Sequence, residues 1–184
     1  MAYTTINDPS AHFHIQLYTG TGSLHSITNN ANAGDFKPDW IQIKNRSAAW
    51  SNIVFDSSRG VNKALFTPAT DSVNTNGQNY VAWQWKANGG TTSTDTTGAS
   101  SAAGYNTTIQ VNQTAGFSIV RWNGAFDQGN GRYNLGHGLG KIPDFVVIKN
   151  RDQTGDWYVH HKNIDNKLKE QLFHHNNLRN NLHY

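Results

Sequence analysis

Histidines are the residues of this sequence best suited to bind a metal, and two of its nine lie close together near the start. His12 and His14 are two positions apart, so on a strand both imidazoles project from one side, a spacing that can hold a transition metal. No third ligand lies nearby in the sequence. His160–His161 and His174–His175 are adjacent residues, whose side chains diverge on a strand or a helix. We therefore expect no metal site.

Catalytic chemistry lacks its usual residues in this chain. There is no cysteine and no Gly-x-Ser-x-Gly motif, and the stretch GHGLG from Gly136 lacks the Gly-Lys-Ser/Thr ending of a phosphate-binding loop. Glycoside hydrolysis requires two facing carboxylates about 5–10 Å apart. Glu170 is the single glutamate, and the eleven aspartates lie mostly among turn-forming residues. The sequence therefore predicts a protein that is not an enzyme and uses no cofactor.

Aromatic side chains beside amides and charged groups are the remaining candidates for binding. Trp157 and Tyr158 follow the turn-rich stretch RDQTGD, and binding loops commonly sit at such strand ends. A flat exposed ring can stack on the face of a sugar, while neighbouring polar groups bind its hydroxyls. We predict stacking by Trp157 and Tyr158, with hydrogen bonds from Asn150, Arg151 and Asp156.

The charge of the chain argues against nucleic acid and membrane as partners. Its formal net charge is +3 and its pI about 9.2, but the fifteen lysines and arginines are scattered and form no basic run at the start of the chain. Nucleic-acid binding requires such residues to cluster. The apolar runs are too short to cross a bilayer, and the first residues lack the basic and apolar regions of a signal peptide. We expect a soluble protein that is not exported.

A repeated nonapeptide indicates which elements position these residues. PDWIQIKNR (Pro38–Arg46) returns as PDFVVIKNR (Pro143–Arg151), 105 residues later. Apolar residues alternate in both copies, as in a half-buried antiparallel strand. Proline at the entry and asparagine at the exit suit the flanking turns. The nonapeptide is therefore predicted to be a strand with its two turns.

The nonapeptide belongs to a longer internal duplication. FHIQLYTG (Phe13–Gly20) matches FSIVRWNG (Phe117–Gly124) at an offset of 104 residues. In the first copy Phe13, Ile15 and Leu17 alternate with polar or larger residues, and we expect that face to contact a core. Trp83 and Trp85 are likewise expected to be core residues. A shared offset over separate blocks predicts a tandem repeat.

Composition and turn spacing indicate the fold class. Charged residues make up 15% of the chain, and aspartate and asparagine favour turns over helices. Further short strand candidates, separated by turns, are SNIVF, KALFT, YVAWQWKA and TTIQVN. They predict an all-β, antiparallel β-sandwich of jelly-roll or concanavalin-A-like type. We assign an N-terminal arm (1–12), a first β repeat (13–88), a linker or long loop (89–112), a second, shorter β repeat (113–162) and a C-terminal tail (163–184).

The second repeat has no counterpart of the aromatic strand YVAWQWKA. Its end instead carries Leu168, Leu172 and Phe173, a spacing that predicts a short C-terminal helix. The missing strand leaves an open sheet edge, which natural proteins cover. The repeat borrows a strand from YVAWQWKA or another subunit, or the tail Asn163–Tyr184 covers the edge.

Five stretches together carry a resemblance to a known family: HIQLYTGTGSLHSITN, KPDWIQIKNR, NTNGQNYVAWQWKANGG, QTAGFSIVRWNG and LGHGLGKIPDFVVIKNR with WYVHH. They resemble a repeat family in virion proteins of tailed bacteriophages, cyanophages especially. The resemblance covers most of Phe13–His161. It implies a β-sandwich without catalytic residues, in a tail-fibre or other virion structural protein.

Residues and resemblance together give two functional hypotheses. The first is a non-enzymatic virion structural protein of the tail-fibre, adaptor or capsid-decoration type, a homo-oligomer that contacts other virion proteins. The alternative is a glycan-binding module that recognises the host surface. Either protein is made in the host cytoplasm and placed on the tail or capsid of the particle.

Overall fold

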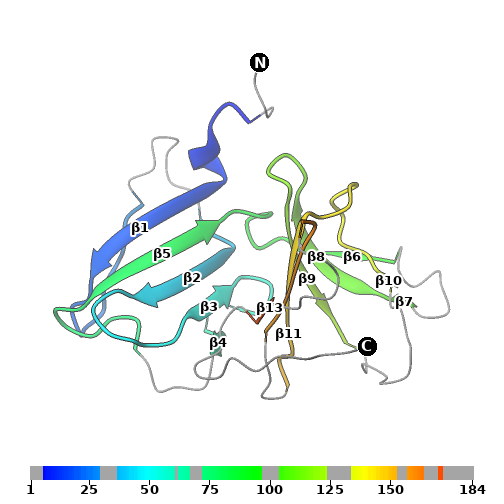
Figure 1. Ribbon diagram of the computed structural model, residues 1–184. Coiled ribbons are helices and arrows are strands. Elements are labelled where there is room, and N and C mark those ends of the chain that lie inside the picture. The colour runs from blue at the N-terminus through cyan, green and yellow to red at the C-terminus, as the bar shows by residue number, and fades with distance from the viewer. Residues whose placement is uncertain are drawn as a thin grey trace.

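The computed structural model describes residues 6–29, 37–60, 62–66, 72–96, 104–123, 134–152, 157–163 and 170–171. Their regular secondary structure is almost entirely β-strand, and the fold is an antiparallel β-sandwich (Figure 1). A single turn of 3-10 helix, η1 (Pro9–Ala11), precedes the first strand, and no helix in the described ranges is long and apolar enough to cross a membrane. The strands are β1 (Phe13–Thr19), β2 (Trp40–Asn45), β3 (Ile53–Asp56), β4 (Ala64–Phe66), β5 (Asn79–Trp85), β6 (Ser93–Asp95), β7 (Gly104–Tyr105), β8 (Thr107–Asn112), β9 (Phe117–Trp122), β10 (Asn134–Leu135), β11 (Phe145–Lys149), β12 (Trp157–His161) and β13 (Glu170–Gln171).

The first repeat forms one five-stranded antiparallel sheet in the order β1-β5-β2-β3-β4. β5, the aromatic strand, lies between β1 and β2, although it follows both in the chain (Figure 1). Its last residue, Trp85, is opposite Phe13 on one side and Trp40 on the other. The Trp85 ring lies 4.7 Å from each of these two rings, measured between centroids. The central strand is therefore held by aromatic packing as well as by backbone hydrogen bonds.

The second repeat is divided between separate sheets. β9 pairs with β8 in the order β6-β8-β9, and β11 pairs with β12 in the order β11-β12-β13. A short parallel pair, β10 with β7, completes the described strands. No strand of the described residues joins β9 to β11, whereas β5 joins β1 to β2 in the first repeat.

The register of the strands confirms the duplication. Trp40 pairs with Asp56 in the first repeat, and Phe145 pairs with His161 in the second, so adding 105 to both numbers converts one pair into the other. The backbone hydrogen bond next to each of these pairs is also repeated at an offset of 105. Ser57 N–H donates to the Asp39 carbonyl at 2.8 Å, and Lys162 N–H donates to the Asp144 carbonyl at 2.8 Å. The two nonapeptides are equivalent strands with equivalent hairpin partners.

A buried polar network joins the first sheet to the β6-β8-β9 sheet. Gln110 of β8 is fully buried, and its amide contacts Ser57 Oγ (3.2 Å from Oε1), Ser58 Oγ (2.7 Å from Nε2) and the N–H of Gly90 (3.0 Å from Oε1). Arg121 of β9 donates to the Ser58 carbonyl at 3.0 Å. Buried polar groups are costly unless they are bonded, so this network fixes how the two sheets meet.

The exposure of β1 corrects one expectation. Ile15 and Leu17 share a face with Phe13, but they are 48% and 55% exposed. β1 is the edge strand of its sheet, and among the described residues it pairs with β5 alone. The alternation therefore separated the two faces of β1, but the more buried face is the other one, with His14, Gln16 and Tyr18. Their partners on β5 are buried, and Trp83 and Trp85, which were expected in the core, are half-buried.

Two boundaries also differ from the expected ones. The range assigned to a linker or long loop, 89–112, contains β6, β7 and β8. Of these, β8 is the strand candidate TTIQVN, which pairs with β9 along six positions. Residues 97–103 lie outside the described residues. The expected C-terminal helix is wrong at Glu170–Gln171, which pair with β12 as strand β13. The rest of that tail, 164–169 and 172–184, lies outside the described residues. The pair Tyr158–Gln171 repeats Ile53–Phe66 of the first repeat at an offset of 105, so β13 is the counterpart of β4. The described tail residues do not cover the β11 edge left by the missing aromatic strand, where the sequence predicted the tail to pack.

Candidate functional site

Trp157 and Tyr158 do not form one binding surface. They are neighbours on β12, so their side chains point to opposite faces of the sheet. Trp157 is 5% exposed and Val159, two residues on, is 7% exposed, whereas Tyr158 is 51% exposed. The prediction that Trp157 stacks on a ligand at the surface is wrong for this structure. Val159 lies two residues after Trp157 and therefore on the same face of the strand, and this apolar residue was the signal that Trp157 is buried.

Asn150 and Arg151 lie at the exposed exit of β11, and they have different roles. The Asn150 side chain accepts the N–H of Asp152 at 2.9 Å, an Asx turn that ends the strand. Arg151 instead reaches the end of β9, where its Nη2 donates to Asn123 Oδ1 at 3.0 Å. Asp156 lies outside the described residues. Of the predicted set, Arg151 is the residue that the structure brings to a concave surface.

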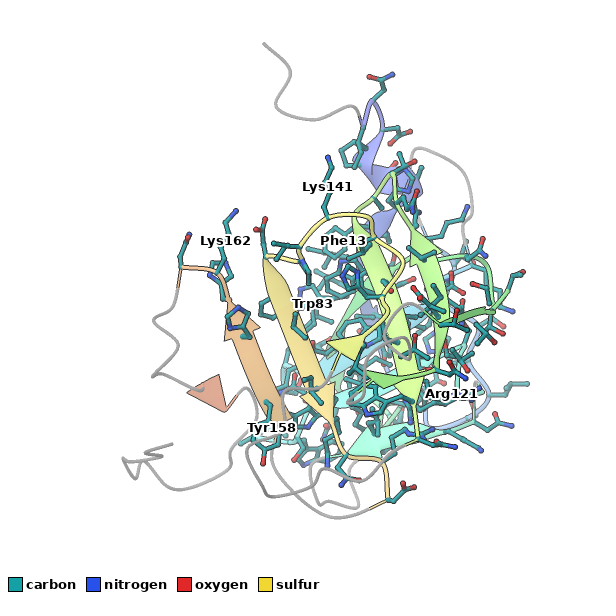
Figure 2. The ribbon with its side chains drawn as sticks, turned by 90° about the vertical axis from the view of Figure 1, so that its right-hand side faces the viewer. Phe13, Trp83, Arg121, Lys141, Tyr158 and Lys162 are labelled. Carbon is teal, nitrogen blue, oxygen red and sulfur yellow. The ribbon has the colours of Figure 1, made fainter. Side chains whose placement is uncertain are left out.

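That surface is a polar hollow of about 720 Å³ at the ends of β8, β9 and β11. We call it the arginine hollow. In Figure 2, Arg121 of this hollow lies apart from Tyr158 on β12. Its six described lining residues are Asn106, Thr108, Arg121, Trp122, Asn123 and Arg151.

The arginine hollow has the chemistry of an anion site. Arg121 and Arg151 each make one of the contacts described above, and a guanidinium carries five N–H donors. None of the six lining residues carries a carboxylate. Planar guanidinium groups bind carboxylate, sulfate or phosphate in a two-pronged geometry, and the Trp122 ring adds an apolar wall. The hollow therefore suits a small acidic group.

Sequence reasoning missed most of this site. Arg121 and Trp122 replace Leu17 and Tyr18 when the two repeats are aligned at 104 residues. The sequence signal for this site was a positively charged residue, Arg121, at the position where the first repeat has the apolar Leu17. Asn106 and Thr108 gave none, because single polar residues around the start of the strand candidate TTIQVN do not distinguish a site from an exposed strand face.

The two neighbouring histidines are engaged by amides. His12 Nδ1 lies 3.1 Å from Asn112 Nδ2, and His14 Nε2 lies 3.2 Å from Gln16 Oε1. The described part of the chain contains no group of three or more histidine, cysteine, aspartate or glutamate side chains placed to hold a metal ion.

Comparison with known proteins gives a family without a function. The family model described as "Domain of unknown function (DUF7483)" matches residues 8–73 and again residues 66–181. Together the two matches cover most of the chain, and the chain belongs to this family. No curated protein and no solved structure matches it. Two matches in one chain agree with the duplication seen in the strand register.

Proposed function

We propose that this DUF7483 family member is a non-enzymatic structural subunit of a bacteriophage virion, which assembles with copies of itself and with other virion proteins. The observation that carries the proposal is the edge of β11 opposite β12, from Phe145 to Ile148. Among the described residues β11 pairs with β12 alone. Ile142 and Phe145, at its entry, are 93% and 52% exposed.

This edge differs from the exposed surface of an ordinary monomer. Natural proteins cover or charge a free strand edge, because its unpaired N–H and C=O groups pair with other chains. Here the edge carries large apolar side chains instead. The equivalent strand of the first repeat is fully paired, and its Trp40 packs on Trp85. A subunit interface accounts for an edge that is covered in one repeat and exposed in the other. The resemblance of the repeat motifs to tail-fibre and virion structural proteins supports placing that interface on a phage particle.

The proposal has two direct tests. Mass spectrometry of purified particles from the phage that encodes the chain should detect it as a stoichiometric component. Light scattering during size-exclusion chromatography should give an oligomer whose mass falls in a Phe145→Glu variant. Tyr158→Glu is the matched control, because Tyr158 is equally exposed (51%) on β12 and should leave the mass unchanged. A monomer that is absent from the particles would contradict the proposal.

A second candidate function, recognition of a host-surface glycan, is favoured by the arginine hollow. Two guanidinium groups beside Trp122 suit a sugar that bears a carboxylate, such as a uronic or sialic acid, over a neutral sugar. On a glycan array the chain should then bind acidic glycans selectively. Arg151→Gln should reduce that binding at least tenfold. Arg46→Gln changes the exposed equivalent arginine of the first repeat, and it should leave binding unchanged. Equal signals on neutral and acidic glycans would rule this function out.

A further inference from the structure

The first repeat shows what normally lies between a β1-type strand and a β2-type strand. β5 pairs with both, and its start also holds their ends together. Gly20 N–H donates to the Gln78 carbonyl at 2.8 Å, and Arg46 N–H donates to the Asn79 carbonyl at 2.7 Å. The backbone of β5 therefore links the exits of β1 and β2.

The second repeat has the two flanking strands, and among the described residues no strand lies between them. β9 is the equivalent of β1, and β11 is the equivalent of β2 by sequence and register. Their exits are linked by side chains, through the bond from Arg151 to Asn123 at 3.0 Å. Arg151 is the equivalent of Arg46, whose backbone bonds β5 in the first repeat. A central strand holds its two neighbours about 9.5 Å apart, a span that an extended arginine and asparagine can bridge. We call this interval between β9 and β11 the vacant strand position.

We propose that the vacant strand position receives an extended segment of the β5 type from another polypeptide, by β-strand addition. This inference deepens the proposed assembly function, because it names the part of the partner that binds and the place where it binds. The partner strand runs antiparallel to β9 and β11, as β5 does to β1 and β2.

The aromatic face of the vacant strand position defines one requirement for the partner. In the first repeat Trp85 lies between Phe13 and Trp40, 4.7 Å from each ring. Their equivalents in the second repeat are Phe117 and Phe145, and Phe145 is 52% exposed. An aromatic residue of the partner, placed as Trp85 is, covers the Phe145 ring.

The opposite face defines a second requirement. In the first repeat Ala82 of β5 pairs with Gln16 and Ile43, and it is only 3% exposed. The equivalents of these two residues are Val120 and Ile148. A small residue three positions before the aromatic one fits between them. The partner is therefore an extended segment that alternates aromatic and small or polar residues, as in NYVAWQW.

A peptide with the sequence of residues 77–88, GQNYVAWQWKAN, is the probe for this proposal. Labelled with fluorescein and titrated with the full chain, it should bind and raise the fluorescence anisotropy. A peptide with the Trp85→Ala change should bind at least tenfold more weakly, because its contacts with Phe117 and Phe145 are lost. The chain variant Phe145→Glu should weaken binding to a similar degree, and Tyr158→Glu should not. An unaltered peptide that fails to bind would overturn the proposal.

Hydrogen exchange locates the bound peptide. Added peptide should slow exchange in 117–122 and 145–149 and leave 13–19 and 40–45 unchanged. Protection in the first repeat instead, or at sites that the Phe145→Glu change does not affect, would also overturn the proposal. Oligomeric state is measured separately. Peptide binding without self-assembly would contradict the proposed structural function alone, and assembly without peptide binding would contradict this inference alone.

Discussion

Asp39 and Asp144 occupy the same position in the two copies of the nonapeptide, yet their surroundings differ. Asp39 is 1% exposed, and its carboxylate accepts the N–H groups of Ala87 at 2.7 Å and Gly89 at 2.8 Å. It also accepts the Ser57 hydroxyl at 2.7 Å. The Asp144 side chain is 64% exposed and pairs with Lys162 at 2.9 Å.

The difference follows from the central strand. Ala87 and Gly89 come directly after β5, so the donors that surround Asp39 are present because β5 lies beside β2. Asp144 has no such neighbour among the described residues and remains at the surface. The same short sequence therefore forms a buried anchor or an exposed turn, depending on a strand about forty residues away in the chain.

The largest contrast is expected from removing each aspartate. Asp39→Ala leaves the buried N–H of Ala87, the N–H of Gly89 and the Ser57 hydroxyl without this acceptor, which should cost about 3–5 kcal/mol of stability. Asp144→Ala removes an exposed ion pair and should cost less than about 1 kcal/mol. Urea unfolding followed by tryptophan fluorescence measures both. Equal losses would mean that the two aspartates share one environment, contrary to the structure.

The aromatic residues that follow the aspartates give the next contrast. Trp40→Ala removes a ring packed on Trp85 and should cost about 2–4 kcal/mol. Phe145→Ala removes a ring that is 52% exposed, and it should change the stability of the isolated subunit by less than about 1 kcal/mol. If the peptide of residues 77–88 fills the vacant strand position, Phe145→Ala should lower the free energy of unfolding more in the presence of the peptide than in its absence. An unchanged cost with bound peptide would show that Phe145 does not contact it.

The fold was largely predictable because its main determinants are local. Alternation in the nonapeptides and the constant offset between repeats specified strands, hairpins and an all-β class, and the strand register agrees with them. The position of β5 between β1 and β2 was not predictable, since it depends on pairing between segments far apart in the chain. Within 89–112 the strand TTIQVN was predicted from its β-branched residues, whereas β6 and β7 were missed because they are short and lie among small polar residues.

The candidate site was less predictable than the fold. Arg151 was singled out from the sequence and lines the hollow, but Arg121 and Trp122 come from another sheet, and only tertiary packing brings them near it. Trp157 was wrongly predicted to be exposed, because an aromatic residue beside a turn can lie on either face of a strand. Trp157 lies on the same face of β12 as the buried Val159, and the polar residues of the preceding turn do not change this.

A smaller contrast is expected between Ser57 and Lys162, the equivalent residues whose N–H groups donate to the carbonyls of Asp39 and Asp144. Ser57→Ala removes the hydroxyl that links Asp39 and Gln110 and should cost about 1–2 kcal/mol. Lys162→Ala removes only an exposed partner of Asp144, and its effect should be about 0.5 kcal/mol or less and should vanish in 0.5 M salt. Thermal unfolding at low and high salt separates the two. A salt-dependent loss in Ser57→Ala would indicate that this network is open to solvent.

The smallest contrast concerns alkaline pH, because Tyr18 in the first repeat corresponds to Trp122 in the second. Burial, and then the neighbouring Tyr80 phenol, raise the pKa of Tyr18 above its usual value. Its hydroxyl donates to the Val73 carbonyl at 2.6 Å, and its ring stacks on Tyr80 at 5.0 Å. In the unfolded chain the phenol ionises near pH 10.

The folded state therefore holds the Tyr18 proton more tightly than the unfolded state does. Its contribution to stability is complete below about pH 10 and is lost as the pH rises beyond that value. The slope should be well under the one-proton limit of about 1.4 kcal/mol per pH unit, because the side chain is only partly buried. Urea unfolding of the parent chain and of Tyr18→Phe, from pH 8 to 11.5, isolates the effect by subtraction. Parallel curves would show that the phenol keeps its solution behaviour, whereas a Trp122→Phe control should run parallel to the parent, since an indole has no proton to lose in this range.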